Sequence, residues 1–402
     1  MQTLGLGETA RSRVGGAWVE GAGDEVELID PYVDAPLLAY RDAGAAVAQQ
    51  ACEAARAAQR DWAARTAAER GAVLHRISAA VSGAAEPLAR LEALSAGKPI
   101  RDCRVEVAKV AEMFAYYAGW ADKRHGEVIP VPTGHLVYTL REPLGVVFQI
   151  TPWNAPVFTA GWQIAPALAA GNGVVLKPSE LTPLTTLALV ALAEEQAGLP
   201  PGLVNVLAGL GPTAGEAAIA HPAVAKVIFV GSAATGRRVA AAAGAALKPV
   251  VLELGGKSAN IVFADADLSA AAKGAQAAIF SAAGQSCVAG SRLLVQAEIA
   301  EAFRARVAAG MAKLTLGDPL DEATEVGPVG NRAQHARVTA AVRDAMAGGA
   351  EAVQGAAPAS GLFVPPTLLS GLAPEAPAAT EEIFGPVVAA LPFEDEAEAI
   401  AL

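Results

Sequence analysis

Cysteine is scarce in this chain, and its three cysteines lie far apart. Cys52, Cys103 and Cys287 form no closely spaced pair, so the sequence predicts no disulfide framework and a reducing compartment. The chain has no Cys-x-x-Cys and no His-x-x-x-His pattern. These absences argue against a zinc site, and we expect no metal.

Runs of basic residues and long apolar runs are absent as well. The net charge is −11, which argues against a nucleic-acid partner. The Ala-rich stretches are interrupted by Gly, Arg, Glu or Gln before they could span a bilayer, so we expect no membrane partner. Residues 1–13 lack the apolar core of a signal peptide. Together these features predict a cytoplasmic protein.

Length and apolar content are what the chain has in abundance. It has 402 residues, of which 53% are hydrophobic and 18% charged, so we expect two or more domains with large buried sheets. Residues 43–121 show helical spacing of Ala, Leu and Val. Two alternating segments, 128–132 and 135–141, flank Thr133-Gly134 and predict a β-hairpin.

After residue 143 the pattern changes to strands alternating with helices. Helices are expected at 184–197 and 235–246, between apolar strands about 25–30 residues apart, which is the spacing of right-handed βαβ units. The sequence therefore predicts an α/β fold with a doubly wound parallel sheet. A second α/β segment follows residue 255, with helices near 300–314 and 332–347. The expected strands are 145–150, 173–176, 204–207, 226–230, 250–254, 259–263 and 292–295.

Cys287 lies in a turn rich in small residues, Gly284-Gln285-Ser286-Cys287-Val288-Ala289-Gly290. Backbone N–H groups in such a turn favour the reactive thiolate, so Cys287 is a candidate nucleophile. The alternative is a small buried hydrophobic residue, which is how we interpret Cys52 and Cys103. The local sequence leaves both interpretations of Cys287 open.

Polar residues follow two of the expected strands, where parallel sheets bind ligands. Asn154 comes after the first strand and could stabilise an oxyanion, or it could cap the next helix. Lys177 and Glu180 follow the second strand and suit a ribose with two free hydroxyls. A solvated Lys–Glu pair is the alternative.

Three later segments carry similar candidates. Gly231 to Arg237 has two glycines around a helix start, which suits a pyrophosphate, although a plain turn would look alike. Glu253 ends an apolar strand before Gly-Gly, where a carboxylate can act as a base, or can cap a turn. Glu382 and Phe384 could bind a second ribose and cover a flat ring, or form a surface turn.

Taken in order, these motifs closely resemble the aldehyde dehydrogenase superfamily. They are Pro152-Trp153-Asn154, Lys177-Pro178-Ser179-Glu180, Glu253 to Ser258, Gly284-Gln285-Ser286-Cys287 and Glu382 to Pro386. The resemblance covers the chain from about residue 25 to its last residue. It implies a cofactor domain over 1–125 and 143–254, an oligomerisation hairpin over 126–142 and a catalytic domain over 255–402.

The resemblance also implies an activity and its residues. The activity would be NAD(P)-dependent oxidation of an aldehyde to a carboxylate. Cys287 would be the nucleophile, Glu253 the base that activates water, and Asn154 an oxyanion donor. The implied cofactor residues are Ile150, Thr151, Pro152, Trp153, Lys177, Ser179, Glu180, Gly211, Phe229, Gly231, Ser232, Leu254, Glu382 and Phe384.

Several details within the family can be read from single residues. Glu180 would repel a 2′-phosphate, which favours NAD over NADP. Relatives that release the thioester to coenzyme A generally lack a glutamate at the position of Glu253, so hydrolysis is favoured and acylation of coenzyme A is the alternative. Ala233 follows Ser232, where the family often has a second hydroxyl residue; the backbone amides are unaffected.

The expected substrate pocket has no cationic side chain. By resemblance it is lined by Ala155, Phe158, Thr159, Trp162, Ser286 and Val288. This set predicts a neutral, apolar or aromatic aldehyde rather than a semialdehyde that bears a carboxylate.

The printed sequence ends inside an expected helix, 394–402, whereas family members continue further. We therefore expect the catalytic domain to be incomplete, and a homodimer or homotetramer only if it is completed. A non-catalytic nucleotide-binding remnant is the alternative to an enzyme.

Overall fold

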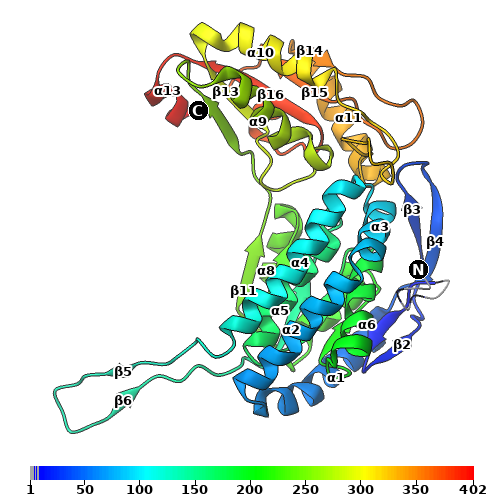
Figure 1. The fold of residues 1–402 in the computed structure, drawn as a ribbon, viewed down its shortest axis with the longest axis vertical. Coiled ribbons are helices and arrows are strands. Elements are labelled where there is room, and N and C mark those ends of the chain that lie inside the picture. The colour runs from blue at the N-terminus through cyan, green and yellow to red at the C-terminus, as the bar shows by residue number, and fades with distance from the viewer. Residues whose placement is uncertain (1–3, 5, 7–8) are drawn as a thin grey trace. The chain divides into compact units, whose positions relative to one another are not determined.

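The computed structural model describes residues 4, 6 and 9–402, which divide into two compact units. The first consists of residues up to 28 together with 36–92 and 103–253. The second consists of 29–35, 93–102 and 254–402. Figure 1 shows that each unit has its own sheet with helices packed against it.

The first unit is built on a seven-stranded sheet with the order β11-β10-β7-β8-β9-β1-β2. Neighbouring strands from β11 to β9 are parallel, and β1 and β2 are added antiparallel at one edge. Every residue of β7 and β8 is buried, as expected for apolar strands covered on both faces. The strands are β1 (Ser12–Val14), β2 (Ala17–Val19), β7 (Val146–Ile150), β8 (Gly173–Lys177), β9 (Val204–Val206), β10 (Val224–Val230) and β11 (Val250–Glu253).

Helices of the first unit lie against this sheet. Thr66 and Glu69 form a capping box that starts α2, with the Glu69 carboxylate accepting from the Thr66 N–H. Gly198 ends α6 in the left-handed conformation. The helices are α1 (Gly44–Ala64), α2 (Ala67–Gly83), α5 (Pro156–Ala169), α6 (Leu184–Ala197), the π-helical turn η2 (Gly211–Gly215), α7 (Glu216–Ala220) and α8 (Ala233–Ala245). Two further helices, α3 (Ala85–Ala96) and α4 (Ile100–Trp120), each have residues in both units.

The second unit has a five-stranded sheet with the order β12-β13-β16-β15-β14. Only β14 runs antiparallel to its neighbour. Its main core packs Phe280, Leu293, Phe303 and Met311 between the sheet and helices α9 and α10. The elements are β12 (Ala259–Val262), α9 (Leu268–Phe280), the 3-10 turn η3 (Ser281–Gly284), β13 (Arg292–Gln296), α10 (Ala297–Met311), α11 (Arg332–Ala347), β14 (Glu351–Gln354), β15 (Thr367–Ser370), α12 (Pro377–Thr380), β16 (Val387–Phe393) and α13 (Glu396–Ala401).

The doubly wound α/β fold predicted from sequence is confirmed. Each expected strand after residue 143 is present within a few residues of its predicted bounds, and α6 coincides with the predicted 184–197 helix. The hairpin is present, but β5 (Val128–Ile129) and β6 (Val137–Tyr138) pair over only two residues each. Strands β1 to β4, which include β3 (Glu25–Asp30) and β4 (Ala35–Arg41), were not predicted.

Among the described residues, none of the helices combines the length and the apolar character needed to cross a lipid bilayer.

Candidate active site

In the first unit, the carboxyl ends of five parallel strands form one edge of the sheet. The chain passes from β7 through β8 to β9, and then returns to β10 and β11 on the other side of β7. The topological switch point therefore lies between β7 and β10, where open α/β sheets bind ligands. Ile150 pairs with Phe229 across these two strands. The structure thus brings Ile150, Thr151, Phe229, Gly231 and Ser232 to one place.

Helix α8 begins at this switch point. Ser232 is its N-cap, and the Ser232 hydroxyl accepts a hydrogen bond from the Thr235 N–H at 3.3 Å. A Cβ on Gly231 would lie 2.7 Å from the Phe229 ring, so glycine is required for the chain to turn here. The N-terminus of a 13-residue helix carries a partial positive charge, which suits a phosphate.

Lys177 and Glu180 lie beyond β8, the neighbour of β7. Lys177 is 3% exposed, and its ammonium donates to the backbone oxygens of Pro178 at 2.8 Å and Gly209 at 3.1 Å. Burial lowers the pKa of Lys177, and the nearby Glu180 carboxylate, 3.6 Å away, opposes that shift. The alternative of a solvated pair does not fit a buried lysine. Ser179 is also buried, and Gly211 begins the turn η2.

The segment from 151 to 155 is tied to the same edge. The Thr151 N–H donates to the Lys177 backbone oxygen, and the Thr182 hydroxyl donates to the Trp153 backbone oxygen. The N-cap position of α5 is occupied by Ala155, without a side-chain cap, so Asn154 does not occupy that position. Pro152, Trp153 and Asn154 are all half-buried.

Glu253 is the last residue of β11, at the same sheet edge. Its backbone oxygen accepts a hydrogen bond from the Gly231 N–H at 3.0 Å, which joins the ends of β10 and β11. The residue is half-buried, and so is Leu254, which begins the second unit. The sheet therefore places Glu253 beside the loop that leads into α8.

The residues expected to line a substrate pocket differ in exposure. On α5, Trp162 is 42% exposed, Phe158 is half-buried, and Thr159 is only 4% exposed and offers little surface to a ligand. Ala155, just before the helix, is half-buried. In the second unit, Ser286 is half-buried and Val288 is 76% exposed.

Cys287 lies in the second unit on the loop between η3 and β13. The loop opens with three consecutive residues at positive φ: Ala282 at 49°, Ala283 at 53° and Gly284 at 69°. Such a backbone is costly for alanine and persists only where surrounding contacts hold it. Cys287 itself is half-buried, whereas Cys52 and Cys103 are buried as predicted. Burial raises the pKa of the Cys52 thiol to about 12.

Buried Gln285, which the sequence analysis did not single out, braces this loop. Its amide nitrogen donates to the Ala282 backbone oxygen at 3.0 Å, and its amide oxygen accepts from the Gly330 N–H at 2.8 Å. Gly284 also packs against a second loop, because a Cβ there would lie 2.0 Å from the Gly385 oxygen. The Cys287 loop and the loop that carries Glu382 and Phe384 are therefore in contact.

Gln334 of α11 fixes the second of these loops. Its amide nitrogen donates to the backbone oxygens of Ile383 at 2.9 Å and Phe384 at 2.8 Å. Phe384 has a φ of 58°, a strained value for an aromatic residue. Neither glutamine was predicted as a site residue, because each acts on a segment more than 40 residues away.

Glu382 folds onto the backbone of Gly255 and Gly256. Its carboxylate accepts from the Gly256 N–H at 3.3 Å, and a Cβ on Gly255 would lie 1.9 Å from the same carboxylate. Burial raises the pKa of Glu382. Gly255 therefore leaves room for a carboxylate that a larger residue at this position would displace.

Lys257 follows this Gly-Gly pair, and its ammonium nitrogen is fully buried. Among the described residues, that nitrogen has no hydrogen-bond partner. Burial, with a further contribution from Arg292, lowers the pKa of Lys257 to about 8, and Glu382 opposes the shift. A charged, unpaired ammonium here costs stability.

Replacing Lys257 with methionine should therefore stabilise the protein at pH 7, by about 1–3 kcal/mol. The native lysine loses its proton near pH 8 in the folded state but near 10.5 when unfolded. Between these values the unfolded chain binds more protons, so wild-type stability rises with pH and the advantage of the variant shrinks. Thermal unfolding of wild type and K257M at pH 7, 8.5 and 10 measures this difference in stability. Exposed Lys273 provides the control, K273M, and a pH-independent gain in K257M would contradict the expectation.

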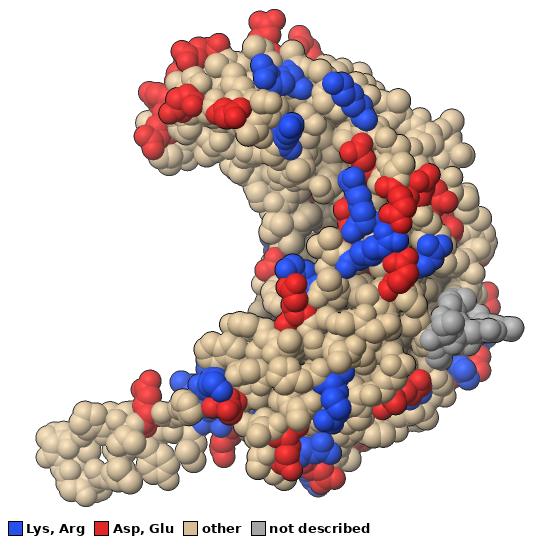
Figure 2. Space-filling view, viewed as in Figure 1, with Lys and Arg blue, Asp and Glu red and all other residues tan. Residues whose placement is uncertain are grey.

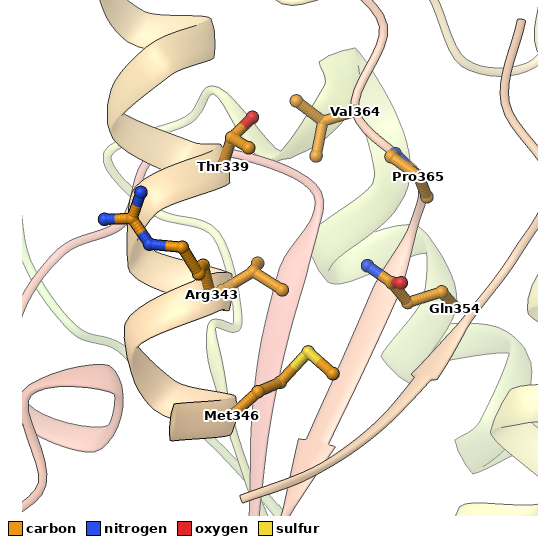
Figure 3. Close-up of a pocket in the computed structure, with 7 residues that line it drawn as sticks. Thr339, Arg343, Met346, Gln354, Val364 and Pro365 are labelled. Atoms are coloured by element: carbon orange, nitrogen blue, oxygen red, sulfur yellow. The ribbon is translucent and has the colours of Figure 1, made fainter. Parts of the chain in front are cut away.

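A separate pocket of about 300 Å³ lies beside α11 in the second unit. Figure 3 shows Thr339 and Met346 of the helix on the side of Val364, Pro365 and Gln354, while the Arg343 guanidinium points away from them. It contains none of the residues predicted from the motifs.

Comparison with known proteins identifies the relationship. The aldehyde dehydrogenase family model matches residues 18–402. Human retinal dehydrogenase 2 is 43% identical over 343 residues, which are 84% of this chain but only 66% of that protein. Betaine aldehyde dehydrogenase 2 of Rhizobium meliloti is 41% identical over 393 residues, covering 96% of this chain and 81% of the relative.

Solved structures agree with the sequence matches. The crystal structure of PnpE in complex with nicotinamide adenine dinucleotide is 43% identical and covers 97% of this chain and 82% of that one, with a TM-score of 0.95. The matched region thus spans just under two thirds of retinal dehydrogenase 2 and about four fifths of the other two relatives. The fold, the order of the motifs and these matches agree, and the chain belongs to the aldehyde dehydrogenase family.

Proposed function

We propose that this chain oxidises an aldehyde to its carboxylate with NAD⁺, through a thioester on Cys287. The proposal rests on the conformation of the Cys287 loop, in a chain that belongs to the aldehyde dehydrogenase family. Its backbone is held in a strained conformation by buried Gln285, and its cysteine is half-buried rather than buried in the core. Strain held in place by surrounding contacts is typical of functional loops.

The edge of the first sheet suits a dinucleotide. The N-terminus of α8 at the switch point fits a pyrophosphate, and Lys177 with Glu180 fits a ribose. The Thr151 hydroxyl at that edge is buried and has no hydrogen-bond partner among the described residues. When bound, NAD⁺ accepts a hydride. The solved PnpE complex contains this dinucleotide and supports NAD as the cofactor here.

The chain's own residues then supply the remaining chemistry. The Cys287 thiolate would add to the aldehyde carbon, and the Asn154 amide with the Cys287 backbone N–H would bind the oxyanion. Loss of hydride from that adduct leaves a thioester on Cys287. Glu253 would take a proton from the water that attacks the thioester, releasing the carboxylate and the thiolate. Glu382 and Phe384 would hold the nicotinamide end of the cofactor.

We further propose that the substrate is a neutral, apolar or aromatic aldehyde. None of the six residues expected to line the pocket is charged, and Trp162 presents an exposed aromatic surface. A carboxylate buried there would lose its hydration without a cationic partner. We expect kcat/KM for benzaldehyde or hexanal to exceed that for succinic semialdehyde by about tenfold or more. Initial rates of NADH formation over this panel measure it, and a preference for the diacid would sink the proposal.

The hairpin of residues 126–142 supports a proposal of self-association. It carries several exposed apolar side chains, with Val128 and Leu136 at 74% and Leu140 at 70%. Figure 2 shows few charged side chains over it. Exposed apolar surface of this kind marks an interface. We propose that the protein forms a homodimer or homotetramer when its catalytic domain is complete, and a monomeric mass of that protein by light scattering at micromolar concentration would contradict the proposal.

We also propose a cytoplasmic location, which the wide separation of the three cysteines supports. Cell fractionation tests it, and recovery of the protein in an extracellular fraction would overturn it.

A further inference from the structure

We propose that Asp42 is a positioning and specificity residue of the adenosine-ribose site, and that its charge favours NAD over NADP. The inference rests on the proposed cofactor function. Asp42 follows β4 in the first unit and was not among the residues predicted from the motifs. It is 2% exposed, and no ion pair explains its burial among the described residues.

Both carboxylate oxygens of Asp42 accept hydrogen bonds from one distant loop. The Leu210 N–H donates to Oδ1 at 2.8 Å, and the Thr213 hydroxyl donates to Oδ2 at 2.6 Å. A group that accepts on both oxygens is suited to the ionised form. Asp42 thus fixes the start of η2, where Gly211 lies, from a position about 170 residues earlier in the chain.

Lys177 holds the same loop from the other side. Its ammonium donates to the backbone oxygen of Gly209, the residue just before Leu210. A Cβ on Gly209 would lie 2.6 Å from Asp42 Oδ1, so only glycine lets the carboxylate approach this closely. The buried ammonium of Lys177 and the buried carboxylate of Asp42 therefore both lie against Gly209.

Tyr40, two residues before Asp42, makes a hydrogen bond to Glu180. Its buried hydroxyl donates to the Glu180 backbone oxygen at 3.0 Å, so the short segment from Tyr40 to Asp42 contacts both ribose-side loops. The Lys177 ammonium lies 3.6 Å from the Glu180 carboxylate and also feels the charge of Asp42, so two carboxylates act on one ammonium and leave an excess negative charge. A ribose with free hydroxyls tolerates that excess, whereas a 2′-phosphate is repelled by it.

The test compares Asp42→Asn with a matched control, Thr213→Val. Asparagine keeps an oxygen for the Leu210 N–H but removes the charge, whereas T213V removes one hydrogen bond and keeps the charge. Kd values for NAD⁺ and NADP⁺ are measured by titration without aldehyde, so turnover does not enter. We expect D42N to shift the NADP⁺ to NAD⁺ affinity ratio toward NADP⁺, on the order of tenfold, and T213V to leave the ratio unchanged.

Three results would count against the inference. An unchanged ratio of NADP⁺ to NAD⁺ affinity in D42N would overturn the inference, provided that thermal unfolding shows the variant to be folded. An equal shift in T213V would show that loop geometry rather than charge is responsible, which also overturns it. Wild-type protein that binds neither nucleotide would instead remove the proposed function, and this inference with it.

Discussion

Replacing Cys287 with alanine should abolish NADH formation, with a loss of about four orders of magnitude or more in kcat. Alanine cannot form the covalent adduct from which hydride is lost. The loop should still fold, because Gln285 and the contact with Gly385 hold its strained backbone. Binding of NAD⁺ should be retained, since the cofactor contacts proposed above come mainly from the edge of the first sheet.

The matched control is Cys52→Ala. Cys52 is fully buried, and burial raises the pKa of its thiol to about 12, so it contributes no thiolate near neutrality. We expect this variant to keep its activity with a small loss of stability. Alkylation mapped by mass spectrometry should label Cys287 ahead of Cys52. NADH formation that survives in C287A would refute the nucleophile, and failure of the wild type to turn over any aldehyde, despite binding NAD⁺, would favour the non-catalytic alternative.

Glu253→Gln should separate the two halves of the reaction. The first half needs no general base for water, so we expect a burst of NADH of about one equivalent per Cys287. The second half should slow by a factor of about 10² to 10⁴, the usual contribution of a general base. Glutamine preserves the size and position of the side chain at the end of β11, and the backbone bond from Gly231 to residue 253 is unaffected.

Rapid-mixing measurements of NADH give both phases. A steady-state rate equal to that of the wild type would show that Glu253 does not activate water. Adding coenzyme A supplies the control: if the wild-type product becomes an acyl-coenzyme A, the acylating alternative holds and the hydrolytic role of Glu253 fails. A free carboxylate as the sole product, with and without coenzyme A, supports hydrolysis.

The sequence predicted the parts of the fold with strong local signals. The segment 184–197 is mostly apolar and is followed by Gly198, so its bounds as α6 could be predicted directly. Strand β1 has three residues, and the alternation of charged and apolar residues in β3 stops after Leu28, so neither gives a long period-two pattern. These short strands owe their pairing to tertiary contacts, which local patterns do not encode.

The residues of the candidate site also divide into those that the sequence predicted and those that it did not. Residues within recognisable motifs, such as Lys177 and Glu382, could be named from sequence. Asp42 could not, because an aspartate two residues before α1 would be taken for a helix cap, yet α1 has Ala43 at its N-cap and no side-chain cap. Gln285 and Gln334 were missed because a buried glutamine has no local signature, and its partners are set by the fold.

The position of β16 has a consequence for how the second unit is made. Its sheet has the order β12-β13-β16-β15-β14, so β16, which follows the other four strands in the sequence, lies in the centre. Until residues 387–393 emerge from the ribosome, β13 and β15 have no common neighbour and each exposes an unpaired edge. Open edges of this kind recruit other strands. The sheet of the unit that carries Cys287 can therefore close only after β16 has been translated, and a growing chain that pauses earlier is exposed to aggregation.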